Sequence, residues 1–507
     1  MEALINVLTW PRVVGTVTAY LSSLVIYRLF FHPLARFPGP RLAAITRLYE
    51  GYYDLYQNGQ YTFKIAELHK QYGPIIRISP FELHVSDPAF FDTLYRQDGV
   101  WHKYDWAVDA FAAHGATLFT ADHHLHKARR QPLNPFFSKA RVVSHLGLIQ
   151  RHVEKLCARL SELAKSKMTF DLGAATTAVS RDIANEFIIG KHYNSLGKED
   201  FDVAQVIASQ GGGKMWRTTK FVRWFAPALR LIPPEWVMAA ISDPAMKEFF
   251  QYILTGMKDT RDLIRAAESS TSDDKPTIVH QIVRSGLSRS EKSFDRVFED
   301  VSTVTGAGFE TTASVLRLVL FSLYSNVDIL ERVRTELASA AESQASGDLE
   351  LTTLQQLPYL TACVMEGLRL SPAIATRMAR VAPDRDLFYG DQRIPAGTPV
   401  GMTSILLHTD EKYYSEPNRF NPDRWMDPDP WKIGDKLFVP FSKGTRMCLG
   451  MHLAWADMYL ITSTIVRRFD FQFPSAKAGD FLCTSDQFAV GTSGKGELIA
   501  TATVASG

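Results

Sequence analysis

The feature that most constrains this chain is a cysteine in a short glycine-containing loop that leads directly into a helix. Phe441–Gly450 has the sequence FSKGTRMCLG, and the apolar residues that follow recur with helical spacing. Cys448 is therefore expected near a helix N-terminus, where the partial positive charge and Arg446 favour the thiolate. Gly444 allows a tight turn and a close approach to a flat partner. The pattern predicts a rigidly held sulfur ligand.

A thiolate in a rigid loop is the ligand that a haem iron needs when cleavage of an O–O bond must be promoted. A buried structural cysteine is the alternative. Phe441, Gly444, Arg446, Cys448 and Gly450 fill the pattern Phe-x-x-Gly-x-Arg-x-Cys-x-Gly, and in this the chain resembles the cytochrome P450 family. The resemblance implies haem b with Cys448 as axial ligand to the iron. Phe441 would shield the sulfur, and Arg446 would pair with a haem propionate.

Two further motifs strengthen the resemblance. Glu366-Gly-Leu-Arg369 matches the family's Glu-x-x-Arg, and the spacing puts both side chains on one helical face. Phe420-Asn-Pro-Asp-Arg-Trp425 matches the Phe-x-Pro-Glu-Arg segment except for Asp423. The resemblance implies a structural triad of Glu366, Arg369 and Arg424. By itself the first pair is better explained as a solvated surface ion pair.

Further cationic residues match the family's propionate ligands. His126 and Arg130 resemble its Trp/His-x-x-x-Arg motif, and they share one helical face. Arg380 matches another propionate position, with Arg377 as a close rival. The resemblance therefore implies cofactor binding by His126, Arg130 and Arg380.

The residues on the dioxygen-binding side of the haem are predicted to lie in the long helical segment around Ala307–Thr312 (AGFETT). Glycine inside a helix costs about 1 kcal/mol relative to alanine, so Gly306 and Gly308 indicate a packing contact or a local opening. The family's helix crosses the distal face of the haem, and the resemblance assigns Glu310 and Thr311 to its acid–alcohol pair for proton delivery. Without the cysteine loop, a solvated glutamate and a back-bonded threonine are the simpler interpretation.

The N-terminus is predicted to be a membrane anchor. Val13–Tyr27 carries no charge, and the run is marginal for a span unless Arg28 snorkels. The basic residues that follow it put the rest of the chain in the cytoplasm by the positive-inside rule. Residues 1–36 form the predicted anchor and hinge, and residues 37–507 form the catalytic domain. By resemblance this is a single-pass protein of the endoplasmic reticulum membrane. A buried or interfacial helix is the alternative.

The pattern predicts a mainly α fold with small β-sheets. Ile75–Val85 is predicted to form two short strands, and most of residues 121–325 to form helices, the longest at Ser290–Ser325. Short strands are expected over Asp384–Leu406 and in the last forty residues, with a helix after Gly450.

Composition and motifs limit which partners the protein is expected to have. A net charge of +2 does not favour a nucleic-acid binder, and four cysteines without metal-site spacing fit a reducing compartment. The chain has no Rossmann fingerprint, so electrons are expected from NADPH through a separate P450 reductase. A basic docking face for it is predicted from the following side chains: Lys127, Arg129, Lys139, Lys443 and Arg446.

The substrate is expected to be a lipophilic small molecule. By family position, small, aliphatic and aromatic residues line its pocket. They are Phe111, Leu118, Phe119, Thr303, Ala307, Ala373–Thr376 and Phe488–Val490. The aromatic, aliphatic and cationic stretch Trp216–Met238 is expected either to touch the bilayer near the pocket mouth or to form buried core.

The predicted function is a haem-thiolate monooxygenase that inserts one oxygen atom from O2 into a hydrophobic secondary metabolite. The chain resembles the fungal secondary-metabolism branch of the family. That resemblance favours a terpenoid, with a polyketide or an alkaloid as alternatives. Two other classes remain: a haem-thiolate isomerase or dehydratase, and a non-catalytic haem-binding membrane protein. Consumption of NADPH with substrate and reductase separates the monooxygenase from both.

Overall fold

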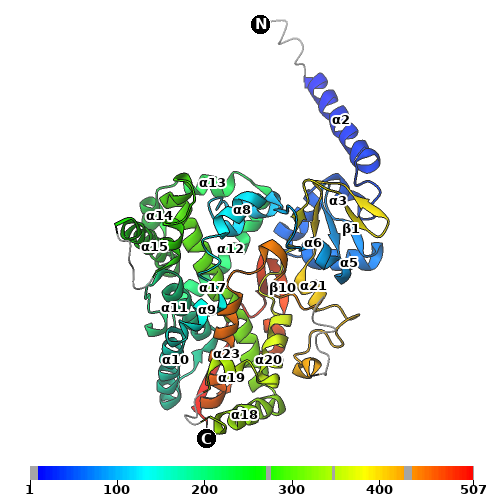
Figure 1. The fold of residues 1–507 in the computed structure, drawn as a ribbon. Helices are drawn as coiled ribbons and strands as arrows, with labels where there is room; N and C mark the ends of the chain where they lie inside the picture. The colour runs from blue at the N-terminus through cyan, green and yellow to red at the C-terminus, as the bar shows by residue number, and fades with distance from the viewer. Residues whose placement is uncertain (1–9, 270–275, 345–348, 427–436, 506–507) are drawn as a thin grey trace.

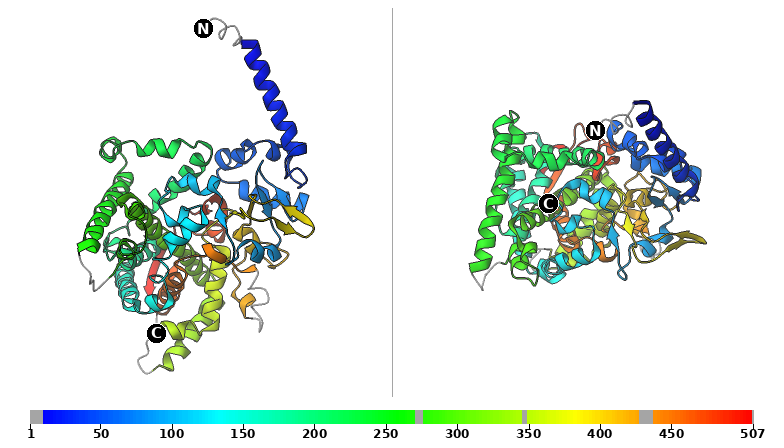
Figure 2. Two further views of the ribbon diagram at one scale, coloured as in Figure 1. Left: turned by 45° about the horizontal axis from the view of Figure 1, so that its top comes forward. Right: turned by 90° about the horizontal axis from the view of Figure 1, so that it is seen from above.

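A computed structural model describes residues 10–269, 276–344, 349–426 and 437–505. Helix α2 (Trp10–Ile26) continues into the π-helical turn η1 (Tyr27–Phe31), and together they project away from the body of the molecule (Figures 1 and 2). This stretch of 22 residues has a mean hydropathy of 1.5, and none of it is buried. Its length and composition suit a membrane span.

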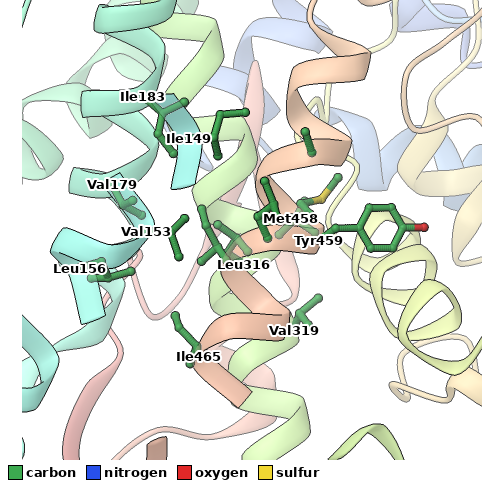
Figure 3. Packing of buried hydrophobic residues seen from close by; sticks show 14 of the residues in the cluster. Ile149, Val153, Leu156, Val179, Ile183, Leu316, Val319, Met458, Tyr459 and Ile465 are labelled. Atoms are coloured by element: carbon green, nitrogen blue, oxygen red, sulfur yellow. The ribbon is translucent and has the colours of Figure 1, made fainter. Parts of the chain in front are cut away.

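The core is a group of long helices on the other side of the molecule. It consists of α10 (Leu146–Ser166), α11 (Leu172–Ile189), α17 (Phe294–Tyr324) and α23 (Met451–Arg468). Their apolar faces interdigitate around α17 and α23, as Figure 3 shows. The labelled side chains in that view include Val153, Ile183, Leu316, Met458 and Ile465. Helix α17, which bears Glu310 and Thr311, is therefore fixed on several sides.

Further helices surround this core. Before α10 lie α3 (Arg41–Ile45), α4 (Leu48–Gly51), α5 (Tyr61–Tyr72), α6 (Phe91–Leu94), α7 (Asp105–Val108), α8 (His123–Arg130) and α9 (Lys139–Val143). Between α11 and α17 lie α12 (Val203–Phe221), α13 (Phe225–Arg230), α14 (Pro234–Ala240), α15 (Pro244–Ser269) and α16 (Ile278–Val283). After α17 come α18 (Val327–Glu342), α19 (Leu351–Leu354), α20 (Pro358–Leu370) and α21 (Ser404–His408). Helices α13 and α14 lie at the same end of the molecule as α2 (Figures 1 and 2).

The β structure of the described residues is small and divided into four sheets. The largest has the order β1-β2-β8-β5-β3, with only β2 and β8 parallel. Its strands are β1 (Ile75–Arg77), β2 (Leu83–Val85), β3 (His102–Lys103), β5 (Arg380–Val381) and β8 (Pro399–Gly401). The others are β4 (Phe170–Asp171) with β12 (Ile499–Val504) and β9 (Phe469–Gln472), β6 (Leu387–Tyr389) with β7 (Gln392–Ile394), and β10 (Cys483–Gln487) with β11 (Ala489–Thr492).

The predicted elements agree well with this architecture. The mainly α fold with small sheets is confirmed, as are the strand pair in residues 75–85 and the helix after Gly450. The longest helix begins at Phe294 rather than Ser290, because Ser290–Lys292 forms a separate 3-10 turn. The helix break at Pro38-Gly39-Pro40 packs against β1, where a Cβ on Gly39 would lie 2.3 Å from the Arg77 carbonyl oxygen.

A substitution at Gly367 on α20 tests how tightly α20 packs against α17. An added Cβ would lie 2.3 Å from Cγ2 of Val319 on α17, so Gly367→Ala forces two helices apart. We expect it to lower the free energy of unfolding by about 1–3 kcal/mol, measured by denaturant titration of the full-length protein in detergent. Gly147→Ala in α10 is the control, since no atom lies within 4 Å of its added Cβ. Equal stability of the two variants would contradict this packing.

Candidate functional site

The cysteine loop is anchored by backbone contacts that require glycine at position 444. Gly444 has φ +76°, and a Cβ there would lie 2.5 Å from the carbonyl oxygen of Arg96. The Cys448 N–H donates to the Phe441 carbonyl at 3.0 Å and closes the loop. The Phe441 ring packs against Trp455, with centroids 6.1 Å apart. Helix α23 begins at Met451, so Cys448 lies just before a helix N-terminus, as predicted.

The Cys448 residue combines accessible surface with close packing by protein atoms. The residue is exposed, although Gly444 and Arg446 beside it are buried. Protein atoms nevertheless surround it closely: burial raises the pKa of the Cys448 thiol, against opposing effects of the Gly450 backbone and Arg130. The two observations agree if the sulfur lies on the wall of an internal space rather than on the outer surface.

Arg446 was predicted to favour the thiolate of Cys448. In the protein chain without haem this prediction is wrong, because Arg446 is not among the groups that lower the pKa of the thiol. The Arg446 guanidinium donates to the carbonyl oxygens of Thr120, Ala121 and Asp122, at 2.7–3.0 Å. It therefore holds the cysteine loop against the segment that precedes α8. Arg130 is the cation that acts on the sulfur, and burial outweighs it.

Five cationic or basic side chains gather, and the Asp122 carboxylate offsets their effect on Arg446 only in part. They are Lys103, His126, Arg130, Arg380 and Arg446, and they are here called the cationic cluster. Burial, followed by Arg380 and Arg130, lowers the pKa of Arg446 to about 9. Burial and the neighbouring cations also lower the pKa values of Lys103 and His126. Within the described residues, no ion pair joins a carboxylate to any member.

Two atoms of the cationic cluster are buried without a hydrogen-bond partner among the described residues: Nη2 of Arg380 and Nε of Arg446. Unpaired buried guanidinium nitrogens are costly in a folded protein. The cluster therefore forms a site for an anionic group with several acceptor oxygens.

Arg377 and Arg380, which sequence alone could not separate, have different surroundings. Arg377 is buried in ion pairs with Glu82 at 2.7 Å and Glu50 at 2.8 Å. Arg380 lies on β5 directly opposite Lys103 on β3. Arg377 is thus neutralised by protein carboxylates, whereas Arg380 remains available to an external anion.

Lys103 is a member of the cationic cluster that sequence reasoning missed. Its ammonium donates to the Leu118 carbonyl, and the side chain is buried. No local motif marks this lysine, because its position depends on the pairing of β3 with a strand far along the chain. A buried lysine can be recognised only after the sheet is known.

The predicted triad contacts are present, with Glu366 and Arg369 fully buried and Arg424 partly buried. Arg369 donates two hydrogen bonds to Glu366, at 2.7 and 2.8 Å, and Arg424 donates to the same carboxylate at 3.0 Å. Arg369 also donates to the carbonyl oxygens of His408 and Pro417. The Glu366–Arg369 pair is therefore not the solvated surface pair that its spacing alone suggested.

On α17 the two predicted distal residues have separate partners. The Thr311 hydroxyl donates to the Ala307 carbonyl at 2.6 Å, within one helical turn. Oε1 of Glu310 accepts from Arg317 at 2.6 Å, whereas its Oε2 is buried without a partner among the described residues. The two glycines also differ: Gly308 packs against Ala184 on α11, whereas no atom lies near an added Cβ at Gly306. Only Gly306 leaves open space.

Three of the predicted pocket residues form an aromatic cluster with Trp216, and the cluster is defined as Phe111, Phe119, Trp216 and Phe488. Phe111 and Phe119 stack with centroids 4.0 Å apart, and Phe488 meets Phe111 edge-on at 4.7 Å. Trp216 meets Phe488 at 5.5 Å. Phe488 has φ +71°, a conformation that bulky residues rarely adopt. Its carbonyl accepts from Ala375 at 2.9 Å, so tertiary contacts hold the strained turn.

The predicted basic docking face is smaller than expected. Arg129 is buried and ion-paired with Glu291 at 2.5 Å, and Arg446 belongs to the cationic cluster. Their predicted surface role is wrong, because both side chains turn inward. Lys127 and Lys139 are exposed, and Lys443 pairs with Asp92 at 2.9 Å. A cavity of about 410 Å³ lies beside the loop, lined by Asp92, Tyr95, Arg96, Gln97, Asp98, Ser442, Lys443, Gly444 and Met447.

Comparison with known proteins agrees with this geometry. The cytochrome P450 family model matches residues 49–495, so the chain belongs to the cytochrome P450 family. Family membership and its named relatives make it an oxygenase that works with haem iron. Its relatives are fungal P450 monooxygenases, which supports a role in secondary metabolism.

Three relatives illustrate the similarity. The chain is 37% identical to cytochrome P450 monooxygenase MO6277 of Ascocoryne sarcoides, with 90% of this chain and 91% of the relative covered. It is 37% identical to tryptophan 6-hydroxylase fscE of Fusarium equiseti, covering 89% and 88%. It is 34% identical to N-acetyltryptophan 6-hydroxylase ivoC of Emericella nidulans, covering 94% of both.

The buried triad gives a test of the framework behind the cysteine loop. Arg369→Lys keeps the charge but loses the two-pronged contact with Glu366 and the carbonyl contacts. We expect the free energy of unfolding to fall by about 3 kcal/mol, because buried hydrogen-bond acceptors lose their partners. Arg419→Lys is the matched control, since Arg419 pairs with Glu416 at the same spacing but on the surface. It should change stability by less than about 0.5 kcal/mol. Similar losses in both variants would refute the distinction.

Proposed function

We propose that this cytochrome P450 inserts one oxygen atom from O2 into a lipophilic secondary metabolite, with Cys448 as the axial ligand of haem b. The observation that carries the proposal is a cysteine just before the N-terminus of α23 together with a buried cationic cluster that has no ion pair to a carboxylate among the described residues. Haem b has both an iron that takes a thiolate and two propionates that take cations.

The residues present fit this cofactor. Cys448 would bind the iron, and Phe441 would shield the sulfur. Gly444 and Gly450 would let the backbone pass close to the ring. The propionates would be held by His126, Arg130, Arg380 and Arg446, to which we add Lys103. The unpartnered nitrogens of Arg380 and Arg446 support this assignment. The triad of Glu366, Arg369 and Arg424 would act structurally, behind the haem.

When bound, the haem supplies the activation of dioxygen. We propose that Thr311 holds a proton at its Oγ1 and that Glu310 replenishes it. The Ala307 carbonyl orients the Thr311 hydroxyl, and Arg317 fixes one oxygen of Glu310. The unpartnered Oε2 of Glu310 is then the atom that exchanges protons, through water. Such a pair distinguishes a monooxygenase from an isomerase or dehydratase, which needs no proton delivery to dioxygen.

The proposal includes NADPH as the electron source and a separate NADPH–cytochrome P450 reductase as partner. The cations that remain to contact an acidic surface of the reductase are Lys127, Lys139 and Lys443. Nucleic acid is not an expected partner.

We propose that residues 1–36 form a single-pass anchor and hinge in the endoplasmic reticulum membrane, with the catalytic domain of residues 37–507 in the cytoplasm. Exposed apolar side chains near α13 and α14 support contact with the same membrane. Trp224, Leu231 and Trp236 are each at least 70% exposed, and these helices lie at the anchor end of the molecule (Figures 1 and 2). Lipophilic substrates would then enter from the bilayer.

For the substrate, we propose a metabolite with a flat unsaturated portion. The aromatic cluster offers ring faces and edges, which favour planar π systems by about 0.5–1.5 kcal/mol beyond burial. Two relatives are named for the hydroxylation of tryptophan and N-acetyltryptophan, both of which carry an aromatic ring. The terpenoid substrate favoured by sequence stays an untested prediction.

The thiolate assignment is tested by a pair of cysteine variants. We expect Cys448→Ala to lose the thiolate-type spectrum of the reduced carbon monoxide complex, together with substrate-dependent NADPH consumption. Cys483→Ala, which changes a cysteine of the β10–β11 hairpin, should keep both. A thiolate spectrum in Cys448→Ala would overturn the proposal. Turnover without NADPH would instead favour an isomerase, and haem binding without turnover a sensor.

The proton-delivery role is tested with Thr311→Ala. We expect haem binding to persist while reducing equivalents are diverted to hydrogen peroxide, measured as peroxide formed per NADPH consumed. Thr335→Ala in α18 is the control, because Thr335 donates to the carbonyl one turn earlier in the same way. Unchanged coupling in Thr311→Ala would count against the assignment.

The substrate proposal is tested by comparing naphthalene with decalin, which have similar size but different planarity. We expect Phe111→Leu to weaken the naphthalene-induced spectral shift by roughly two- to tenfold in affinity and to leave decalin binding unchanged. Phe388→Leu, which alters an exposed phenylalanine, is the control. Equal losses for both ligands would show that the cluster selects by volume alone.

A further inference from the structure

A second group of metal-binding side chains lies where α10, α11 and the segment after α11 meet. His152 comes from α10, Glu186 from α11, and His192 from the segment that follows. Nε2 of His152 lies 2.6 Å from Oε2 of Glu186, and Nδ1 of His192 lies 3.0 Å from the same oxygen. The three ligand atoms all lie within 4.8 Å of one another.

The arrangement directs two imidazole nitrogens to one carboxylate oxygen. Without a cation, each ring must present an N–H to Oε2. One divalent ion between the three atoms would take the place of both N–H donors, with each neutral ring keeping its proton on its other nitrogen, and would offset the carboxylate charge. Oε1 of Glu186 is occupied separately by Arg151, so Oε2 is left to the two histidines. The group is therefore already gathered around a single point.

We propose that His152, Glu186 and His192 bind one Zn²⁺ ion, with water as the fourth ligand. Two imidazole nitrogens and one carboxylate oxygen form a typical zinc ligand set with one open position. Magnesium and calcium prefer ligand sets made only of oxygen. The His152 and Glu186 side chains are nearly buried, whereas that of His192 is 59% exposed. The exposed ring provides both an entry path for the ion and access for water.

The ion would fasten the segment after α11 to the two core helices. Neighbours of His192 already bind α15: Lys191 pairs with Asp259 at 3.2 Å, and Tyr193 donates to the same carboxylate at 2.9 Å. Zinc would complete a junction of α10, α11 and α15. Because it binds the folded protein and requires ligands from separate elements, it should raise thermal stability.

Zinc binding is measured on the full-length, haem-loaded protein in detergent, after treatment with EDTA and dialysis. Zn²⁺ alone is titrated in competition with a chromophoric chelator, and bound zinc is counted by elemental analysis. We expect one zinc per chain and an increase in the midpoint of thermal unfolding. His192→Ala and Glu186→Gln should weaken binding by roughly tenfold or more and remove the increase.

His114→Ala is the matched control, because it removes another exposed histidine with a nearby carboxylate, Asp109 at 3.6 Å. It should bind zinc like the unmodified protein. An unchanged haem spectrum in every variant shows that the fold is retained. Equal zinc affinity in His192→Ala and the unmodified protein would overturn the site. So would failure of the unmodified protein to retain zinc at micromolar free concentration.

Discussion

The cationic cluster is the constraint on which the rest of the site depends. Burying like charges together without an anion costs several kcal/mol per ion. The chain nevertheless brings Lys103 and Arg380 together on paired strands and adds Arg446 from the cysteine loop. Such an arrangement is favourable only when an anionic group with several oxygens completes it. We propose that the propionates of the haem implied by family membership supply that group, so that the protein chain and cofactor form one electrostatic unit.

A rigid framework fixes the cysteine loop relative to this cluster. Arg446 ties the loop to the segment before α8 through carbonyl contacts, while Gly444 lets the loop lie against the backbone of Arg96. The triad around Glu366 joins α20 to the segment just before the loop. Figure 3 shows why α17 cannot shift easily, since core side chains pack it against α23 and α11. The cysteine loop and the helix that bears Thr311 are thus held by one core.

The aromatic cluster is held differently, by ring packing and backbone hydrogen bonds rather than by charge. The positive φ of Phe488 is maintained by hydrogen bonds from residues 375 and 376 to its carbonyl. Three further aromatic rings from separate elements then pack around it. Lipophilic ligands gain most from such ring surfaces, and exposed apolar residues near α13 lie toward the anchor end. Membrane contact and pocket chemistry therefore favour the same class of molecule.

Features that depend on residues close together in the chain could be predicted from their local pattern. They are the loop around Cys448, the Glu366–Arg369 spacing, the long helix that bears Thr311 and the apolar N-terminus. The difference between Arg377 and Arg380 depends on tertiary contacts, because buried carboxylates from distant segments neutralise one and not the other. The tertiary structure also added Lys103 and turned Arg446 inward, since strand pairing and loop docking join residues that no local periodicity relates.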